Sequence, residues 1–341
     1  MKAPPPTVRL FTFLLALLAA IAYGDDASKP DDAQLRAGVI KSLAFLDKEA
    51  DTWMDEKTCN GCHHMPELLW SHREAKRRGF TIDPKMFDEF VDWSYSHSKD
   101  TQAGLEMVAL LKLAMPDKSA PELTDLIVKG QQPDGSWKPA GQLANMQRRG
   151  PHDATGNSTR LFLLALGTQP GTQPGDQAAA EAARAKAAAA LAKDEPAKSV
   201  ETLVYRGLYA QRFGPSDDAA TACAELLKLQ HSDGGWSYIV GQEASDSLAT
   251  GQALYLLQQA LDTRSAEAIA HGQAWLLNHQ RADGGWDIDI TKISKIDRSA
   301  PEKAKSLKAA TGIYTFWGSA WATIGLVQAF PIKETSPSPT Q

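Results

Sequence analysis

Hydrophobic residues recur every three or four positions along most of the chain, which is the pattern of amphipathic helices. Sustained alternation of polar and apolar residues, typical of strands, does not occur. Pro84 and Pro215 stand where helices are expected to begin. The pattern predicts an all-α protein of about twelve helices, near residues 34–50, 64–78, 84–97, 100–115, 120–132, 157–167, 176–193, 199–212, 216–230, 246–261, 265–280 and 316–330.

A short motif recurs between these helices. It reads Gln131-Gln-Pro-Asp-Gly-Ser-Trp137, Gln230-His-Ser-Asp-Gly-Gly-Trp236 and Gln280-Arg-Ala-Asp-Gly-Gly-Trp286. The tryptophans are 99 and 50 residues apart, so the repeat is about fifty residues long, and one copy near 177–193 has lost the motif. Asp-Gly favours a tight turn with positive φ at glycine, and the tryptophan buries apolar area between helix ends. Twelve helices make six hairpins, which must stack to bury their apolar faces.

This motif resembles the QW repeat of squalene-hopene cyclases and their relatives. The hairpin count is similar to the closed α6/α6 toroid that these enzymes share with prenyltransferase β subunits. The resemblance implies a single toroid over residues 31–330. In that family the Gln and Trp side chains tie neighbouring repeats together, which implies a structural role for Gln131, Trp137, Gln230, Trp236, Gln280 and Trp286.

The string Cys59-Asn-Gly-Cys62-His63 is the signature of c-type haem attachment. Two thiols at this spacing can form thioethers with the haem vinyl groups, and the adjoining histidine then reaches the iron. The sequence therefore predicts one covalent haem c, bound through Cys59 and Cys62, with His63 as axial ligand. Two alternatives stay open: a disulfide between the cysteines, or a zinc site with His63 and His64, although no second cysteine pair is present to complete it.

The sixth iron ligand is not specified by the motif. Residues at workable range are His72, His97, Met107, Met146 and His152. A strong distal ligand favours electron transfer, whereas an open position favours chemistry on peroxide, oxygen or small gases. Because the motif follows the first expected helix, where later repeats carry their QW turn, we expect haem at the rim of the toroid that bears these turns.

The N-terminus has the layout of a secretory signal peptide over residues 1–22. Lys2 and Arg9 precede an apolar run that ends at Ala22 and is too short for a permanent anchor. We therefore expect an exported protein, periplasmic or secreted, without a transmembrane span in the mature chain. The formal net charge of −5 argues against nucleic acid as a partner. Residues 331–341, rich in Pro, Ser and Thr, are expected to form a disordered tail.

Two long segments on the side of the QW turns carry basic residues. The segment 138–156 contains Arg148 and Arg149, and the segment 287–315 contains Lys303, Lys305 and Lys308. Basic side chains on an acidic protein suit haem propionates or an acidic redox partner, and a solvated charged loop is the alternative. Ser299 and Glu302 form a capping-box pair, which predicts a short helix in the second segment.

The enzymatic motifs of the resembling families are missing. Squalene-hopene cyclases use the central acid of an Asp-x-Asp-Asp motif, and Asp287-Ile-Asp289 stops one residue short of it. Protein prenyltransferases hold zinc through Asp-x-Cys, but Thr221 stands two residues before Cys223, which we interpret as a buried thiol. The resemblance in fold therefore does not bring the activity with it.

Weak catalytic candidates are Glu201 and Asp246, at the starts of two expected inner helices. Aromatic residues suited to line an apolar, isoprenoid-binding cavity are Tyr205, Tyr209, Tyr255, Trp317 and Trp321. Three functions are thus consistent with the sequence: haem-based electron transfer or redox chemistry, terpenoid processing, and non-catalytic binding or scaffolding with a disulfide in place of haem.

Overall fold

The computed structural model describes residues 29–56, 64–97, 104–139, 153–167, 174–192, 196–214, 216–260, 263–288 and 299–333. Over these ranges the chain is all-helical, with twelve α-helices, the short 3-10 helix η3 (Thr263–Ser265) and one isolated β-bridge between Ser199 and Ile239. The expected signal peptide, the Cys-x-x-Cys-His motif and residues 334–341 of the expected tail lie outside the described residues.

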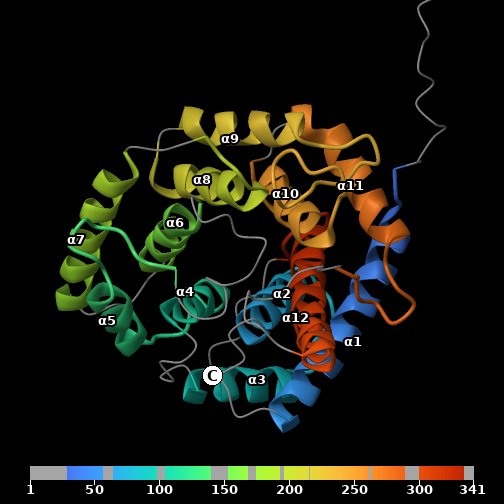
Figure 1. The fold of residues 1–341 in the computed structure, drawn as a ribbon, viewed down its shortest axis with the longest axis horizontal. Coiled ribbons are helices and arrows are strands. Elements are labelled where there is room, and N and C mark those ends of the chain that lie inside the picture. The colour runs from blue at the N-terminus through green and yellow to red at the C-terminus, as the bar shows by residue number, and fades with distance from the viewer. Residues whose placement is uncertain are drawn as a thin grey trace, which may run out of the picture.

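The helices form two concentric rings (Figure 1). The outer ring contains α1 (Asp32–Glu56), α3 (Pro84–His97), α5 (Pro121–Lys129), α7 (Pro174–Leu191), α9 (Ser216–Lys228) and α11 (Ala266–Asn278). The inner ring contains α2 (Met65–Arg77), α4 (Leu105–Ala114), α6 (Ala154–Leu166), α8 (Val200–Phe213), α10 (Ser247–Gln259) and α12 (Ala300–Val327). Each inner helix packs against the next, and α12 packs against α2 and so closes the ring. The predicted α6/α6 toroid is confirmed.

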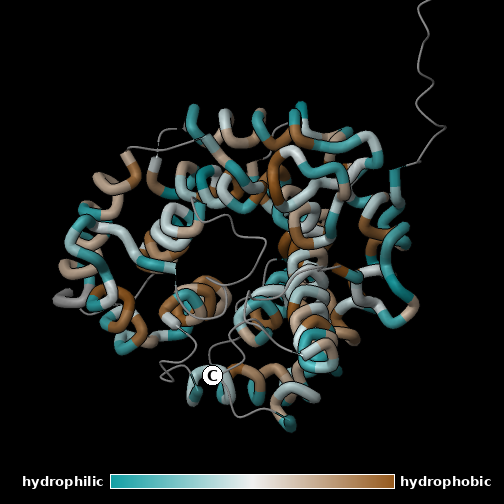
Figure 2. The backbone as a smooth tube through the Cα atoms, in the orientation of Figure 1, coloured by the Kyte–Doolittle hydropathy of each residue, from teal (hydrophilic) through white to brown (hydrophobic). Residues whose placement is uncertain are grey.

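Burial differs between the two rings. Inner helices are buried over most of their surface, apart from the first half of α12, and α10 is buried at every position from Ser247 to Leu257. Outer helices bury one face, and α5 buries only Leu123, Thr124 and Ile127. Figure 2 accordingly shows hydrophilic segments mainly around the perimeter. A helix that is apolar on one stripe belongs on a surface, and one that is apolar all round belongs in a core.

Two glycines allow a close approach between the inner helices α10 and α12. A Cβ atom on Gly251 would lie 2.3 Å from the backbone of Trp321, and one on Gly325 would lie 2.6 Å from the carbonyl oxygen of Gly251. Small residues at a crossing let two helix backbones come together. The seam between α10 and α12 therefore depends on residues without side chains.

Helix α12 begins at Ala300, sixteen residues before the predicted start at 316. The predicted capping box is present, since the backbone N–H of Ser299 donates to Oε2 of Glu302 (3.0 Å). The short helix that it predicted continues without a break into the last helix. Ala- and Lys-rich composition favours this continuation, and Leu307, Ala310 and Ile313 pack against the core.

Candidate functional site

The three motif glutamines join neighbouring outer helices. In every copy the side-chain NH₂ donates to the carbonyl of the glycine four positions on, which directly follows the motif aspartate, and to a carbonyl of the next outer helix. These second acceptors are Ala183 on α7 for Gln131 (2.7 Å), Ala268 on α11 for Gln230 (2.8 Å) and Gly38 on α1 for Gln280 (2.9 Å). Each glutamine thus satisfies two carbonyls and links one repeat to the next.

The three motif tryptophans are buried between an outer and an inner helix. Their indole N–H groups donate to carbonyls near the end of the preceding outer helix, those of Ile127, Leu226 and Leu276, at 2.8, 2.8 and 2.7 Å. Their backbone N–H groups donate to hydroxyls of the following inner helix, those of Thr159, Thr250 and Ser319, at 3.2, 3.0 and 2.9 Å. Each tryptophan therefore connects the two helices of its hairpin.

Positive φ at the motif glycines, predicted from the Asp-Gly pairs, is confirmed. The φ angles are +89° at Gly135, +91° at Gly234 and +97° at Gly284. All three also approach the next outer helix so closely that a Cβ atom would lie 2.4, 2.8 and 2.1 Å from a backbone carbonyl oxygen. Glycine is required at these positions because the backbone has a positive φ and because the next outer helix leaves no space for a side chain.

The haem motif at 59–63 lies outside the described residues, but the residues that flank it are described. Glu56 is the last residue of the outer helix α1, and Met65 is the first residue of the inner helix α2. The motif thus lies in an outer-to-inner connection. The QW turns also follow outer helices and precede inner ones, so the connection is of the same kind.

The residue directly after the motif, His64, is held between two aromatic rings. Its imidazole stacks on Trp53 of α1 and packs at a tilt against Phe316 of α12, with ring centroids 4.1 Å apart in both cases. His64 is 4% exposed, and Met65 beside it is fully buried. Three helices therefore meet at this position and fix the backbone where the motif ends.

The described distal-ligand candidates are placed differently. His72 is buried on α2, with Nε2 2.7 Å from Oδ1 of Asp47 and Nδ1 2.9 Å from the carbonyl oxygen of Leu68, so both ring nitrogens are engaged. His97, at the end of α3, stacks on Trp93. Met107 is fully buried on α4. Met146 and His152 lie outside the described residues.

Buried polar side chains join the inner helices near their N-termini. The hydroxyl of Ser158 on α6 donates to Glu106 on α4. On the other side of α6, Nδ2 of Asn157 donates to Glu201 on α8 (2.9 Å), and Oδ1 of Asn157 accepts from the hydroxyl of Thr202 (2.9 Å). Hydrogen bonds inside a protein hold buried polar groups in defined places. This belt links α4, α6 and α8.

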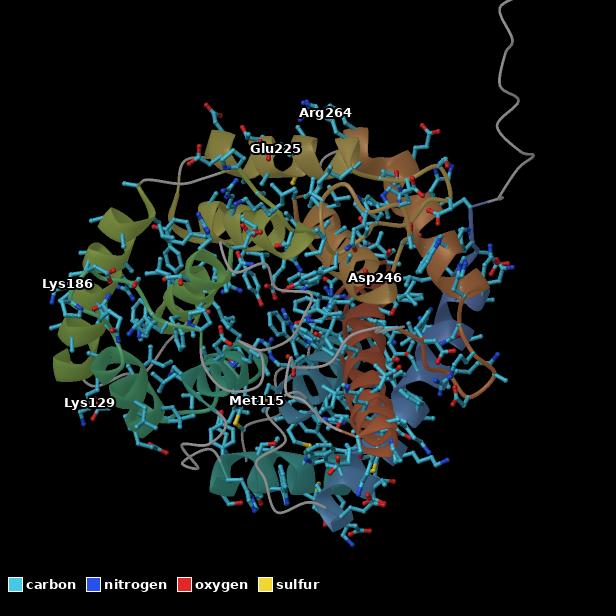
Figure 3. The ribbon with its side chains drawn as sticks, in the orientation of Figure 1. Met115, Lys129, Lys186, Glu225, Asp246 and Arg264 are labelled. Atoms are coloured by element: carbon cyan, nitrogen blue, oxygen red, sulfur yellow. The ribbon has the colours of Figure 1, made fainter. Side chains whose placement is uncertain are left out.

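The two weak catalytic candidates, Glu201 and Asp246, both accept hydrogen bonds from Tyr238. Glu201 is fully buried and accepts from the Tyr238 hydroxyl (2.9 Å). Asp246 is the N-cap of α10, accepts from the backbone N–H of Ala249 (2.9 Å), and also accepts from the backbone N–H of Tyr238 (3.0 Å). Sequence reasoning did not single out Tyr238, which stands two residues after a motif tryptophan. Figure 3 labels Asp246 at the start of α10.

Most of the aromatic residues expected near the bore are core residues. Trp321 and Tyr255 pack with Trp70, with ring centroids between 5.3 and 6.0 Å apart. Burial raises the pKa of Tyr255 to about 12, and the nearby carboxylate of Glu74 adds to the rise. Tyr209 lines a cavity between α7, α8 and α9.

The described ranges contain neither a helix that could span a membrane nor a cluster of metal-binding side chains. No helix there, including the 28 residues of α12, is apolar over enough length to cross a bilayer. No three His, Cys, Asp or Glu side chains gather in these ranges in a way that would hold a metal ion.

Comparison with known proteins gives a similarity to a cyclase. No protein-family model matches the chain. It is similar to a probable squalene–hopene cyclase of Sinorhizobium fredii, with 30% identity over 147 residues, which cover 41% of this chain and 20% of that protein. The chain thus matches a fifth of the cyclase's length. Together with the closed double ring and the QW turns, this similarity supports a scaffold of the terpenoid-cyclase type.

Proposed function

We propose that this chain is an exported monohaem c-type protein on a cyclase-like toroid, and that it works in electron transfer or haem-based redox chemistry. Cys59 and Cys62 would hold the haem through thioethers, and His63 would ligate the iron. The bound haem would supply a one-electron redox centre. The proposal rests on the Cys-x-x-Cys-His motif and on its position in the chain. His64 directly follows the motif, and contacts among three helices hold its side chain in place.

The residues present beside the motif suit a porphyrin. Trp53 offers a partly exposed, flat apolar surface, and Phe316 and Met65 form the buried apolar surroundings of His64. The stacked ring of His64 restricts the peptide that joins it to His63, and an axial ligand needs such orientation from its surroundings. The neighbouring side chains therefore contribute apolar cover and a fixed backbone.

The proposed partner of such a protein is an acidic redox protein. On α12, the side chains of Lys303, Lys305 and Lys308 are exposed, in the same helix as Phe316, which contacts His64. Basic side chains on a protein with a formal net charge of −5 give local complementarity to an acidic surface. Association through these lysines would weaken as salt is added.

The test is expression in a bacterium that carries the periplasmic haem-maturation machinery. We expect the purified protein to be coloured, to keep its haem after denaturation, and to show the absorption bands of a c-type haem. Cys59→Ser and Cys62→Ser should lose most of the covalent haem. Cys223→Ser is the matched control, because Cys223 is buried on α9, outside the motif, and it should keep the full haem content.

A second variant separates attachment from ligation. His63→Ala keeps both thiols, so residual covalent haem is expected, with a changed spectrum because the axial nitrogen is gone. Colourless wild-type protein with Cys59 and Cys62 joined in a disulfide would contradict the proposal and leave the scaffold function. Bound zinc in place of haem would contradict it as well.

The similarity to a squalene–hopene cyclase favours one alternative, the processing of an isoprenoid. Glu201 and Asp246 are the acids that we would assign to it. Squalene incubated with the wild type, Glu201→Gln and Asp246→Asn tests this alternative. A product formed by the wild type and lost in the variants would favour it, whereas no turnover by the wild type would exclude squalene processing.

A further inference from the structure

The outer wall contains a cavity where the repeat pattern is broken. It has a volume of about 350 Å³ and opens between α7, α8 and α9, with Arg160 of α6 also reaching it. We call it the α7–α9 cavity. The connection from α7 to α8 carries no QW motif. The missing copy was expected near 177–193, but helix α7 occupies that run as far as Leu191, so the place of the copy is the connection that follows it.

The length of this connection explains the loss. Eight residues separate Leu191, the end of α7, from Val200, the start of α8, whereas eighteen separate α9 from α10. The short connection pairs with the chain after Trp236 instead. The N–H of Val200 donates to the carbonyl of Tyr238, and the N–H of Val240 donates to the carbonyl of Lys198, both at 3.0 Å.

The α7–α9 cavity matches the place that a tryptophan fills one repeat later. Trp236 lies against Gly272, the seventh residue of α11, and donates its backbone N–H to Thr250, four residues after the N-cap of α10. The equivalent residues are Ala222, the seventh residue of α9, and Leu203, four residues after the N-cap of α8. Both line the cavity.

Half of the residues that line the cavity are aliphatic, and its charged residues are balanced in number. Six of its side chains are aliphatic, namely Ala188, Leu191, Ala192, Leu203, Ala210 and Ala222. Two arginines, Arg160 and Arg206, are matched by two acids, Asp218 and Glu225. Figure 3 labels Glu225 on α9. A balanced lining does not favour an ion of either sign, and burying an uncompensated charge is costly.

We propose that the α7–α9 cavity binds a small, flat, neutral aromatic molecule, in the position that the motif indole takes in the three repeats that carry the motif. An apolar cavity of roughly 150 Å³ is enough for benzene, so the volume here accommodates a bicyclic ring. This site involves α6 to α9 and is independent of the haem proposed beside α1, α2 and α12.

Titration of the full-length protein with indole, followed by calorimetry and thermal unfolding, tests the proposal. We expect saturable binding with a dissociation constant of the order of 1 mM or below. Ala222→Leu places a larger side chain at the buried floor of the cavity and should weaken binding at least about tenfold, since it occupies the volume. The matched control is Ala185→Leu, at an exposed position of α7 outside the cavity lining, which should bind indole as the wild type does.

A second variant, Ala188→Phe, keeps the test valid if Ala222→Leu fails to fold. Ala188 lies exposed at the edge of the cavity, so Ala188→Phe should fold normally and also block indole. No saturable binding to the wild type, or equal binding by Ala188→Phe and Ala185→Leu, would overturn the site. Indole-3-carboxylate or tryptamine binding more than tenfold tighter than indole would overturn the neutral ligand class.

Discussion

The side-chain amide of Gln280 donates to the carbonyl of Gly38 at 2.9 Å, across 242 residues of sequence. The bond joins the last outer helix, α11, to the first, α1. The same amide also donates to Gly284 in its own turn (3.0 Å). The glutamine that links sequential repeats elsewhere is therefore also used to close the outer ring.

Gln280→Leu should lower the free energy of unfolding by about 1–3 kcal/mol, because two carbonyls lose their donor. Urea-induced unfolding followed by circular dichroism measures the change. Gln177→Ala, at an exposed position of α7, serves as control and should have little effect. An unchanged stability of Gln280→Leu would show that the link between Gln280 and Gly38 contributes nothing to ring closure.

Gly234→Ala should be more destabilising than Gly241→Ala. Both glycines have positive φ, +91° and +86°, so each substitution pays for a left-handed backbone, about 1–2 kcal/mol. Only at Gly234 would the new Cβ also meet a backbone atom, the His271 carbonyl oxygen at 2.8 Å, while nothing lies within 4 Å at Gly241. The difference between the midpoints of thermal unfolding of the two variants gives the cost of the steric contact alone, because both variants share the cost of the left-handed backbone. Equal losses would mean that α11 shifts to admit the methyl group.

Glu201→Leu should lower stability by about 2–4 kcal/mol, since Asn157 and Tyr238 both donate to this buried carboxylate. Glu201→Gln keeps an oxygen acceptor at the same place and should cost clearly less. Chemical denaturation of the pair gives the comparison. Similar losses in both variants would indicate that the charge of Glu201, rather than its hydrogen bonds, stabilises the belt between α6 and α8.

Lys112 should make stability rise with pH in the alkaline range. Burial lowers the pKa of its amine from 10.5 to about 8, although Glu122 acts in the opposite direction. Between these values the unfolded chain binds a proton that the folded chain has lost, so the free energy of unfolding increases with pH. Below about pH 8 the folded state carries the desolvation penalty in full.

Removal of this penalty should stabilise the protein at neutral pH. The free energy of unfolding of Lys112→Met is expected to exceed that of the wild type by up to roughly 3 kcal/mol. The loss of the hydrogen bond from Lys112 to the Thr124 hydroxyl (2.8 Å) reduces this gain. Lys129→Met, on an exposed side chain of α5, is the control and should change little. Denaturation curves over the alkaline range provide the test. A pH-independent difference between Lys112→Met and the wild type would contradict the assignment.

The sequence by itself determined the features that depend on neighbouring residues. Hydrophobic periodicity located the helices, Asp-Gly pairs predicted the positive φ of Gly135, Gly234 and Gly284, and the spacing of the tryptophans predicted stacked hairpins. The capping box at Ser299 was also readable. The periodicity, the Asp-Gly pairs and the capping box each arise within one or two helical turns, where chain geometry alone sets which groups meet, whereas the tryptophan spacing is a repeat that can be counted along the chain.

Only the tertiary structure decided how the rings close and what the buried polar groups contact. The packing of α12 on α2, the close approach of Gly251 and Gly325, the Tyr238 contacts of Glu201 and Asp246, and the α7–α9 cavity all join residues that lie far apart in the chain or in separate repeats. A local pattern shows that a side chain is to be buried but not which partner buries it, because the partner is brought into place by the packing of the whole ring.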